Sequence, residues 1–205
     1  MRWSSNLAIS KAPDPRSDIL IIGDSRAQEW RIPCRCNVVN AGISGQTTTQ
    51  ILLRYQKQIR TFSPRLVLIQ AGINDLKAIP LFPSREDEII RQCMSNLAEM
   101  AELAKQQEMT VLLTTIIPTG DVPFERRTVW SDQVDEAVRK VNLFILTLQS
   151  NDVNVVDLSS VISDSSGHTA ARFRRDFLHL NVTGYSELNK KIRPTLEAEG
   201  FLFPN

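Results

Sequence analysis

Ser25 is the residue of this sequence that is best placed to act as a nucleophile. It follows the apolar run Ile19–Ile22 and the pair Gly23-Asp24, where a strand would end and a helix begin. A hydroxyl there can attack an electrophile once a base takes its proton, although serine is also an ordinary helix N-cap. The chain has 2 histidines, and His179 follows the carboxylate of Asp176 by three residues. If Asp176 holds one imidazole nitrogen, the other can accept the proton of Ser25, as in a serine hydrolase triad.

Groups that could stabilise a developing oxyanion also follow predicted strands. The backbone amides of Ser25 and Gly42 and the side-chain amide of Asn74 could converge on one oxygen, and each such donor contributes about 3 kcal/mol to a transition state. The less favoured interpretations are that Gly42 is only a turn glycine and that Asn74 is only an Asx-turn residue. Next to these residues, Asp24 and Asp75 are predicted to accept hydrogen bonds from backbone amides.

These residues need a scaffold that brings distant parts of the chain to one place. Apolar runs without alternation are typical of strands buried on both faces, and helical periodicity separates them. The predicted strands are residues 19–22, 37–41, 65–71, 109–117 and 153–156. The predicted helices are residues 26–31, 46–60, 85–107, 131–149 and a last helix capped by Asn181 or Thr183, with residues 159–177 as a loop that has room for one helical turn.

Strands that alternate with helices predict an α/β protein with a doubly wound, five-stranded parallel sheet in a three-layer αβα sandwich. Five strands suggest the flavodoxin-like order 2-1-3-4-5. The carboxyl ends of parallel strands meet at one edge of the sheet, which is where such folds bind ligands. Residues 1–17 are polar and contain two prolines, so they are expected to be a loose leader before a single domain of residues 18–205.

Composition excludes several functional classes. The net charge of +1 does not suggest a nucleic-acid partner, and no apolar run is long enough for an integral membrane segment. Three cysteines cannot make a complete disulfide framework, and Cys34 and Cys36 have no second pair to complete a zinc site. The sequence does not indicate an oligomeric state. A cytoplasmic protein is expected if the chain is complete, and a periplasmic or secreted one if an export signal was trimmed.

The chain resembles the SGNH hydrolase superfamily, also called GDSL-like lipases and esterases. Four blocks match in order, at residues 23–25, at residues 40–42 with 44–45, at residues 72–75 and at residues 176–179. The resemblance implies Ser25 as nucleophile, His179 as base and Asp176 as the residue that orients it. It implies Gly42 and Asn74 as oxyanion donors, and neither a metal nor an organic cofactor. Arg26 stands where the family name has leucine, and it is not expected to take part in the chemistry.

The expected activity is hydrolysis of a small-molecule carboxylic ester, such as an acylated sugar or lipid, through an acyl-enzyme on Ser25. Short loops favour an open site for short acyl or acetyl groups. An O-acyltransferase would use the same triad, and a glycan-binding α/β module without catalysis is a further alternative.

Several other side chains are open to two interpretations. The cluster Arg172, Arg174 and Arg175 could bind an acidic substrate group, but a solvated charged loop is favoured. His168 is expected to be exposed. Four apolar side chains could line an acyl pocket or simply pack against the core, namely Leu81, Phe82, Phe124 and Trp130.

Overall fold

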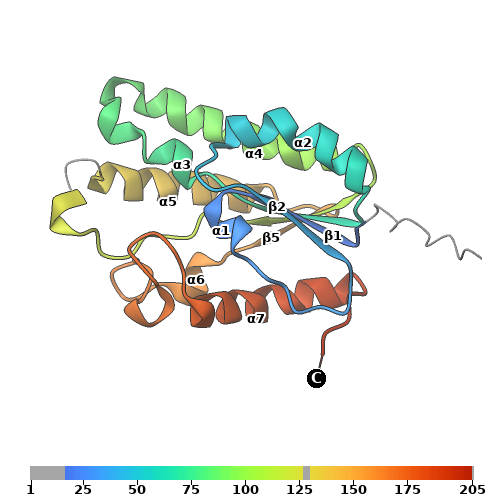
Figure 1. Ribbon diagram of the computed structural model, residues 1–205. Coiled ribbons are helices and arrows are strands. Elements are labelled where there is room, and N and C mark those ends of the chain that lie inside the picture. The colour runs from blue at the N-terminus through green and yellow to red at the C-terminus, as the bar shows by residue number, and fades with distance from the viewer. Residues whose placement is uncertain (1–16, 127–129, 205) are drawn as a thin grey trace, which may run out of the picture.

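A computed structural model describes residues 17–126 and 130–204 and shows a five-stranded, all-parallel sheet (Figure 1). The strands are β1 (Ile19–Gly23), β2 (Val38–Gly42), β3 (Leu66–Gln70), β4 (Thr110–Thr114) and β5 (Val153–Val156). Their order is β2-β1-β3-β4-β5, which confirms the predicted topology. The register aligns the last residue of β1, Gly23, with Gly42 of β2 and Gln70 of β3. The first three strands therefore end at one level.

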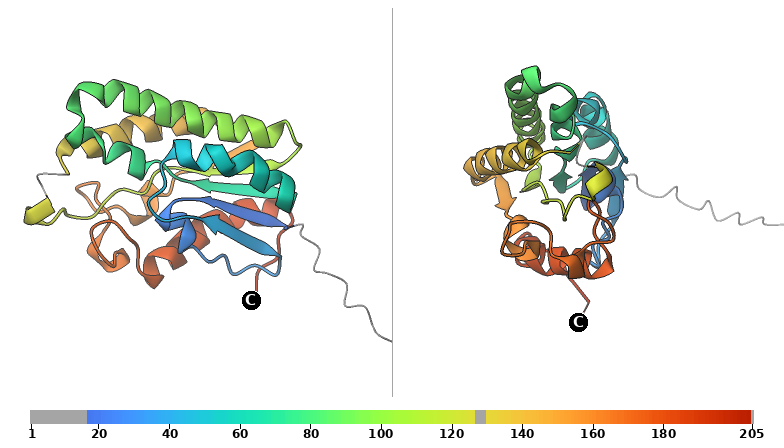
Figure 2. Two further views of the ribbon diagram at one scale, coloured as in Figure 1. Left: turned by 45° about the horizontal axis from the view of Figure 1, so that its top comes forward. Right: turned by 90° about the vertical axis from the view of Figure 1, so that its left-hand side faces the viewer.

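Helices cover both faces of the sheet (Figure 2). One face packs against α2 (Thr48–Phe62), α4 (Glu86–Lys105) and α5 (Asp132–Thr147), and the short α3 (Ile73–Leu76) lies on the same side. The other face packs against α1 (Ser25–Gln28), α6 (Ser159–Ile162) and α7 (Val182–Ala198). The short 3₁₀ helices are Ile79–Leu81, Pro83–Arg85, Phe124–Arg126 and Ala171–Phe173.

Side-chain alternation along β1 explains the two layers of core. Leu20 and Ile22 point into the first layer and Ile19 and Ile21 into the second, and all four are fully buried. A continuous apolar run is therefore what a strand in the middle of this sandwich requires.

The edge strands differ from the prediction that every strand is fully buried. All five residues of β2 are half-buried, and β5 is buried only at its two ends. Each of these strands pairs with one neighbour only. The second edge of such a strand stays partly open, because no further strand covers it.

Two predicted elements end earlier than the sequence indicates. The first helix stops at Gln28 rather than at residue 31, because Asn40 of β2 donates its side-chain amide to the carbonyls of Ala27 (2.8 Å) and Trp30 (2.9 Å). Strand β4 stops at Thr114 rather than at residue 117, because the amide and carbonyl of Ile116 pair with the side chain of Asn142 from α5. In both places a side-chain amide takes over backbone groups that regular structure would otherwise pair.

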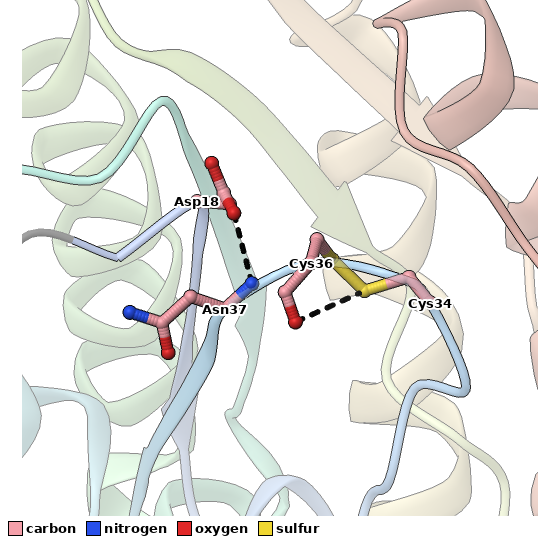
Figure 3. Close-up of a disulfide and its surroundings, with 4 residues drawn as sticks. All are labelled: Asp18, Cys34, Cys36 and Asn37. Atoms are coloured by element: carbon pink, nitrogen blue, oxygen red, sulfur yellow. Dashed lines mark hydrogen bonds between the residues drawn. A yellow bond between two sulfur atoms is a disulfide. The ribbon is translucent and has the colours of Figure 1, made fainter.

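The amino-terminal side of the sheet holds a disulfide between Cys34 and Cys36, in the turn before β2 (Figure 3). Beside it, Asp18 accepts a hydrogen bond of 2.8 Å from the amide of Asn37. Cys93 is free and buried in α4. One bridge and one free thiol agree with the odd cysteine count.

The predicted leader of residues 1–17 falls almost wholly outside the described residues. Ser17, the first described residue, is buried and donates its amide to the carbonyl of Phe62 (2.8 Å). No helix in the described ranges is both long and apolar enough to span a bilayer.

Candidate active site

Ser25 lies at the carboxyl end of β1, in a turn that glycine makes possible. Gly23 has φ +154°, and a Cβ there would lie 1.9 Å from the carbonyl oxygen of Gln70 in β3. No other residue could approach β3 so closely. Asp24 caps the helix that follows, because its Oδ1 accepts a hydrogen bond of 2.9 Å from the amide of Arg26. This confirms the predicted role of Asp24 and sets Ser25 as the first residue of α1.

His179 approaches Ser25 from the loop between β5 and α7. Its Nε2 lies 3.1 Å from the Ser25 Oγ, and its Nδ1 lies 3.0 Å from Oδ2 and 3.1 Å from Oδ1 of Asp176. When the Nδ1 proton is donated to Asp176, Nε2 is left as an acceptor for the hydroxyl proton of Ser25. The structure thus brings together the three residues that the sequence singles out for a triad.

Asp176 is ionised and held rigidly. Partial burial raises the pKa of its carboxyl group, but hydrogen bonds from the amides of Leu178 and His179 and from the His179 ring outweigh burial and leave the pKa below its usual value. Both amides donate to the same oxygen, Oδ1, at 2.8 Å. A carboxylate that stays charged can stabilise an imidazolium when one forms.

Gly42 differs from its prediction as an oxyanion donor. Its single amide hydrogen is donated to Oδ1 of Asn40 (2.9 Å) and is not free for another acceptor. A glycine is required there for another reason, since a Cβ would lie 2.3 Å from the amide nitrogen of Gln28. Gly42 therefore lets α1 pack directly on the end of β2.

Gly45 lies in the matching block at residues 44–45, has no role predicted from the sequence, and has a free backbone amide on this loop. It is exposed, has φ +79°, and its amide has no partner among residues 17–126 and 130–204. The residues on either side are fixed, because the amide of Ser44 donates to Oε1 of Gln28 (2.8 Å) and the carbonyl of Gln46 accepts from Asn74 Nδ2 (3.0 Å). A glycine with positive φ, three residues after Gly42, is the signal that could have indicated it.

Asn74 lies in α3, shortly after the end of β3, and is buried. Its Nδ2 has two hydrogens, of which one is donated to Gln46, so the other remains available. The amide of Ser25 likewise has no partner in the described part of the chain. These two donors are free to meet an oxyanion beside Ser25.

Two further side chains, for which the sequence predicts no role, hold the loop around the site. Asn40 satisfies the end of α1, as described above. Arg54 of α2 donates to Oε1 of Gln46 (2.7 Å), to the carbonyl of Ala41 (2.8 Å) and to the carbonyl of Gly23 (3.3 Å). The ends of β1 and β2 are thereby tied to the loop that contains Gly45.

Asp75 holds the start of α2, which confirms its predicted role. Its carboxylate accepts from the amide of Thr48 at 2.9 Å and from the hydroxyl of Thr48 at 2.6 Å. Burial raises the pKa of Asp75 against these hydrogen bonds. The loop between β2 and α2 is therefore fixed at both of its ends.

The arginines before Asp176 lie at the surface, and Arg172 and Arg175 are exposed, as the favoured interpretation of a solvated charged loop predicts. Arg174 pairs with Asp121 at 2.6 Å, and Arg175 pairs with Glu29 at 3.0 Å. Arg172 stacks on the ring of Phe173, with its guanidinium carbon 4.4 Å from the ring centroid. Arg174 and Arg175 are thus paired with acidic side chains from distant parts of the chain.

His168 is also more enclosed than predicted. Its side chain is 33% exposed and its Nδ1 lies 3.6 Å from Asp121 Oδ1. Among the predicted apolar lining residues, Trp130 is buried and packs edge-to-face on Phe177 with 5.5 Å between ring centroids. The other three, Leu81, Phe82 and Phe124, are exposed.

No group of three or more histidine, cysteine, aspartate or glutamate side chains in the described residues is arranged to hold a metal ion.

Comparisons with known proteins agree with this geometry. Residues 22–186 match the sequence model of the GDSL-like Lipase/Acylhydrolase family. The platelet-activating factor acetylhydrolase IB subunit alpha2 of Rattus norvegicus is 23% identical over 203 residues, which cover 93% of this chain and 82% of that protein. The protein of the same name in Homo sapiens gives the same identity and coverage.

Solved structures of similar fold include a GDSL-like lipase from Bacteroides thetaiotaomicron, with a TM-score of 0.70, 23% identity and 88% of each chain covered. A catalytic mutant of an acetylxylan esterase from Geobacillus stearothermophilus has a TM-score of 0.59 and 20% identity, with 86% of this chain and 93% of that chain covered. At these identities, the structural likeness establishes the fold.

Proposed function

The chain belongs to the GDSL-like lipase/acylhydrolase family of the SGNH hydrolases, and on this premise we propose that it cleaves carboxylic esters with Ser25 as its nucleophile. The observation that supports this most directly is the hydrogen-bond chain from Ser25 Oγ through His179 to Asp176, with 3.1 Å between Oγ and Nε2. A serine that only capped a helix would need no base beside it, so a capping role for Ser25 does not explain the contact with His179.

The reaction proceeds in two halves. Ser25 Oγ attacks the ester carbonyl while Nε2 of His179 takes the hydroxyl proton, and the tetrahedral intermediate collapses as His179 gives that proton to the departing alkoxide. An acyl-enzyme and a free alcohol result. Water then attacks the acyl-enzyme with His179 as base, which releases the carboxylic acid and restores the Ser25 hydroxyl.

The proposed oxyanion hole consists of the Ser25 amide, Asn74 Nδ2 and the Gly45 amide in place of Gly42. The hydrogen bond from Asn74 to Gln46 supports this choice, because it links Asn74 to the residue that follows Gly45. Each donor would lower the barrier by about 3 kcal/mol.

Acetyl and other short acyl esters of a sugar or a lipid are the proposed substrates. The names of the similar proteins support the acetyl group, since one is an acetylhydrolase and another an acetylxylan esterase. They point to different alcohols, so the leaving group is best found by assay with a panel of acetylated sugars and acetylated glycerolipids.

The test replaces Ser25 by alanine and measures hydrolysis of p-nitrophenyl acetate. We expect S25A to lose at least about 10³-fold in kcat, because it removes the hydroxyl that contacts the proposed base, His179. The matched control is S131A. Ser131 likewise lies at the start of a helix, as the N-cap residue of α5, but it makes no side-chain capping bond and belongs to a different element. Its activity should stay within about twofold of wild type.

A fluorophosphonate probe completes the experiment. It should label wild type and S131A on Ser25 and leave S25A unlabelled. Undiminished turnover by a folded S25A would refute the proposal, and an unlabelled, inactive wild type would favour a glycan-binding module. Transfer of acetyl to an added sugar alcohol faster than hydrolysis would identify an acyltransferase.

A further inference from the structure

Arg26 follows Ser25 directly and is one of the largest completely buried side chains in the protein. Arginine is almost never buried without partners, and its guanidinium stays charged under ordinary conditions. Taking this charge out of water is costly unless hydrogen bonds compensate it. A completely buried arginine next to the proposed nucleophile therefore calls for an explanation by its contacts.

The guanidinium joins two segments that are far from Arg26 in the sequence. Nε donates to the carbonyl of Leu178 at 2.9 Å, and Nη1 donates to the carbonyl of Ile117. Ile117 lies in the segment after β4, and Leu178 is the residue immediately before His179. Because the acceptors are main-chain carbonyls, Arg26 fixes the path of the backbone in both segments.

The backbone of Arg26 is fixed as firmly as its side chain. Its amide donates to Asp24 Oδ1 at 2.9 Å, and its carbonyl accepts the hydroxyl of Tyr185 from α7 at 2.9 Å. Arg26 therefore cannot move without disturbing the helix cap on one side and α7 on the other.

Both backbone polar groups of Leu178 are held by hydrogen bonds. Its amide donates to Asp176 Oδ1 at 2.8 Å, while its carbonyl accepts from Arg26. The peptide bond that joins Leu178 to His179 thus has its oxygen fixed by the residue that is covalently attached to Ser25. Ser25 and His179 are therefore linked through Arg26 and the Leu178 carbonyl, in addition to their own hydrogen bond.

We propose that Arg26 is a positioning residue of the hydrolytic site, and that its guanidinium holds the Leu178 carbonyl so that the His179 ring stays at hydrogen-bonding distance from Ser25. This inference rests on the proposed function. It assigns a positioning role to Arg26, which stands where the family name has leucine and which was not expected to take part in the chemistry. A displacement of about 1 Å in a catalytic group can cost about 100-fold in rate.

The test compares R26L and R26K with wild type in kcat and KM for p-nitrophenyl acetate, together with thermal unfolding of each variant. Leucine removes both donors and suits a buried site. Lysine keeps the charge, but one ammonium cannot span two carbonyls in the way a guanidinium does. The matched control is R65L, because Arg65 also donates to a main-chain carbonyl, that of Glu199 at 3.0 Å, away from Ser25.

We expect kcat to fall about 100-fold in R26L and about tenfold in R26K, with KM within about twofold of wild type in both. R65L should keep its kcat within about twofold. A purely structural arginine would instead lower the unfolding temperature and leave kcat per folded molecule unchanged. That result, or a loss confined to KM, would overturn the proposal.

If R26L fails to fold, R26K decides the question, since a folded R26K with wild-type kcat would also overturn the positioning role. Failure of the proposed function looks different. In that case wild type itself neither hydrolyses the ester nor reacts with the fluorophosphonate. An active wild type with an equally active R26L refutes the role of Arg26 alone.

Discussion

Asp24 is a carboxylic acid that lies wholly inside the protein, one residue before Ser25. Burial raises its pKa from 3.8 to about 6, against the charge of Arg26 and the hydrogen bond from the Arg26 amide, which both lower it. One carboxylate oxygen, Oδ1, accepts that amide, and Oδ2 has no partner within the described residues. The acid form suits such a site better than the charged form.

This environment makes the stability of the protein depend on pH. The folded state binds the Asp24 proton more tightly than the unfolded state does, so the stabilisation is complete below pH 4 and is lost as the pH rises through about 6. A pKa difference of about 2 corresponds to about 3 kcal/mol. In D24N the side chain is neutral at every pH. The free energy of unfolding of wild type minus that of D24N should therefore decrease by up to about 3 kcal/mol between pH 4 and pH 8.

Urea denaturation of both proteins at several pH values measures this difference. The contributions of the other titrating groups to the free energy of unfolding largely cancel, because both proteins contain them. D164N is the matched control with the opposite sign. Asp164 is exposed, and hydrogen bonds led by that from Ser166 lower its pKa, so its contribution is lost at low pH rather than at high pH. A wild-type-minus-D24N difference that does not change with pH would show that Asp24 titrates normally.

At the scale of single residues, the sequence located the reactive groups but could not show which hydrogens were already used. His179 is one of 2 histidines in the chain, Ser25 follows a predicted strand and Asp176 precedes His179 by three residues, and the structure places the three in contact. Gly42 was predicted as an oxyanion donor because it follows a strand at the same edge of the sheet as Ser25 and lies in a matching block. That its amide is occupied depends on Asn40, whose side-chain direction only the fold determines. The burial of Arg26 depends in the same way on segments more than ninety residues away.

At the scale of elements, α1 is a helix of 4 residues that carries Ser25. So short a helix has no stability of its own. It is held by the side chain of Asn40 and by direct packing of Gly42 against Gln28. The placement of the nucleophile is thus a property of the contact between α1 and β2.

Gly42→Ala should disturb this contact. The added Cβ would lie 2.3 Å from the amide nitrogen and 2.6 Å from the Cα of Gln28, and backbone atoms tied by Asn40 cannot move aside cheaply. We expect the free energy of unfolding to fall by about 2 kcal/mol, and kcat to fall because Ser25 moves with α1. Denaturation and ester hydrolysis measure the two effects.

Gly167→Ala separates overlap from backbone strain. Gly167 has φ +84°, but a Cβ there would meet nothing within 4 Å. It should cost about 1 kcal/mol through its left-handed backbone and leave kcat unchanged. If G42A were no more destabilised than G167A and equally active, the packing of α1 on β2 would not position Ser25.

The strands and long helices could be predicted because their patterns are local. Ile19–Ile22 reads as a buried strand from composition alone, and it is one. The ends of β4 and of the first helix could not be predicted, because Asn142 and Asn40 terminate them from other elements. Helix α3 has 4 residues, too few for a periodic signal.

At the scale of the whole molecule, different groups lie at the carboxyl ends and at the amino ends of the strands. The residues proposed for catalysis follow the carboxyl ends of the strands. The disulfide Cys34–Cys36 precedes β2 and so lies at the amino end, where the Arg35 amide also pairs with the Leu202 carbonyl at 2.7 Å.

The double variant C34S/C36S should therefore change stability and leave catalysis intact. A bridge between residues two positions apart restricts the unfolded chain only slightly, so its loss should cost about 1–2 kcal/mol. We expect kcat and KM within about twofold of wild type. Wild type treated with a reductant should behave in the same way, since the remaining thiol, Cys93, is buried. A large fall in kcat with little change in stability would show that the disulfide at the amino ends of the strands affects catalysis at their carboxyl ends.

The hydrogen bond between Ser25 and His179 spans 154 positions of the chain. A polypeptide emerging from a ribosome presents Ser25 long before His179 exists, and the strands β2 to β5 are synthesised in between. Reaction of Ser25 with a fluorophosphonate therefore requires the segment that carries His179 to be in place. Time-resolved labelling during refolding would measure when that segment docks, rather than when the core collapses.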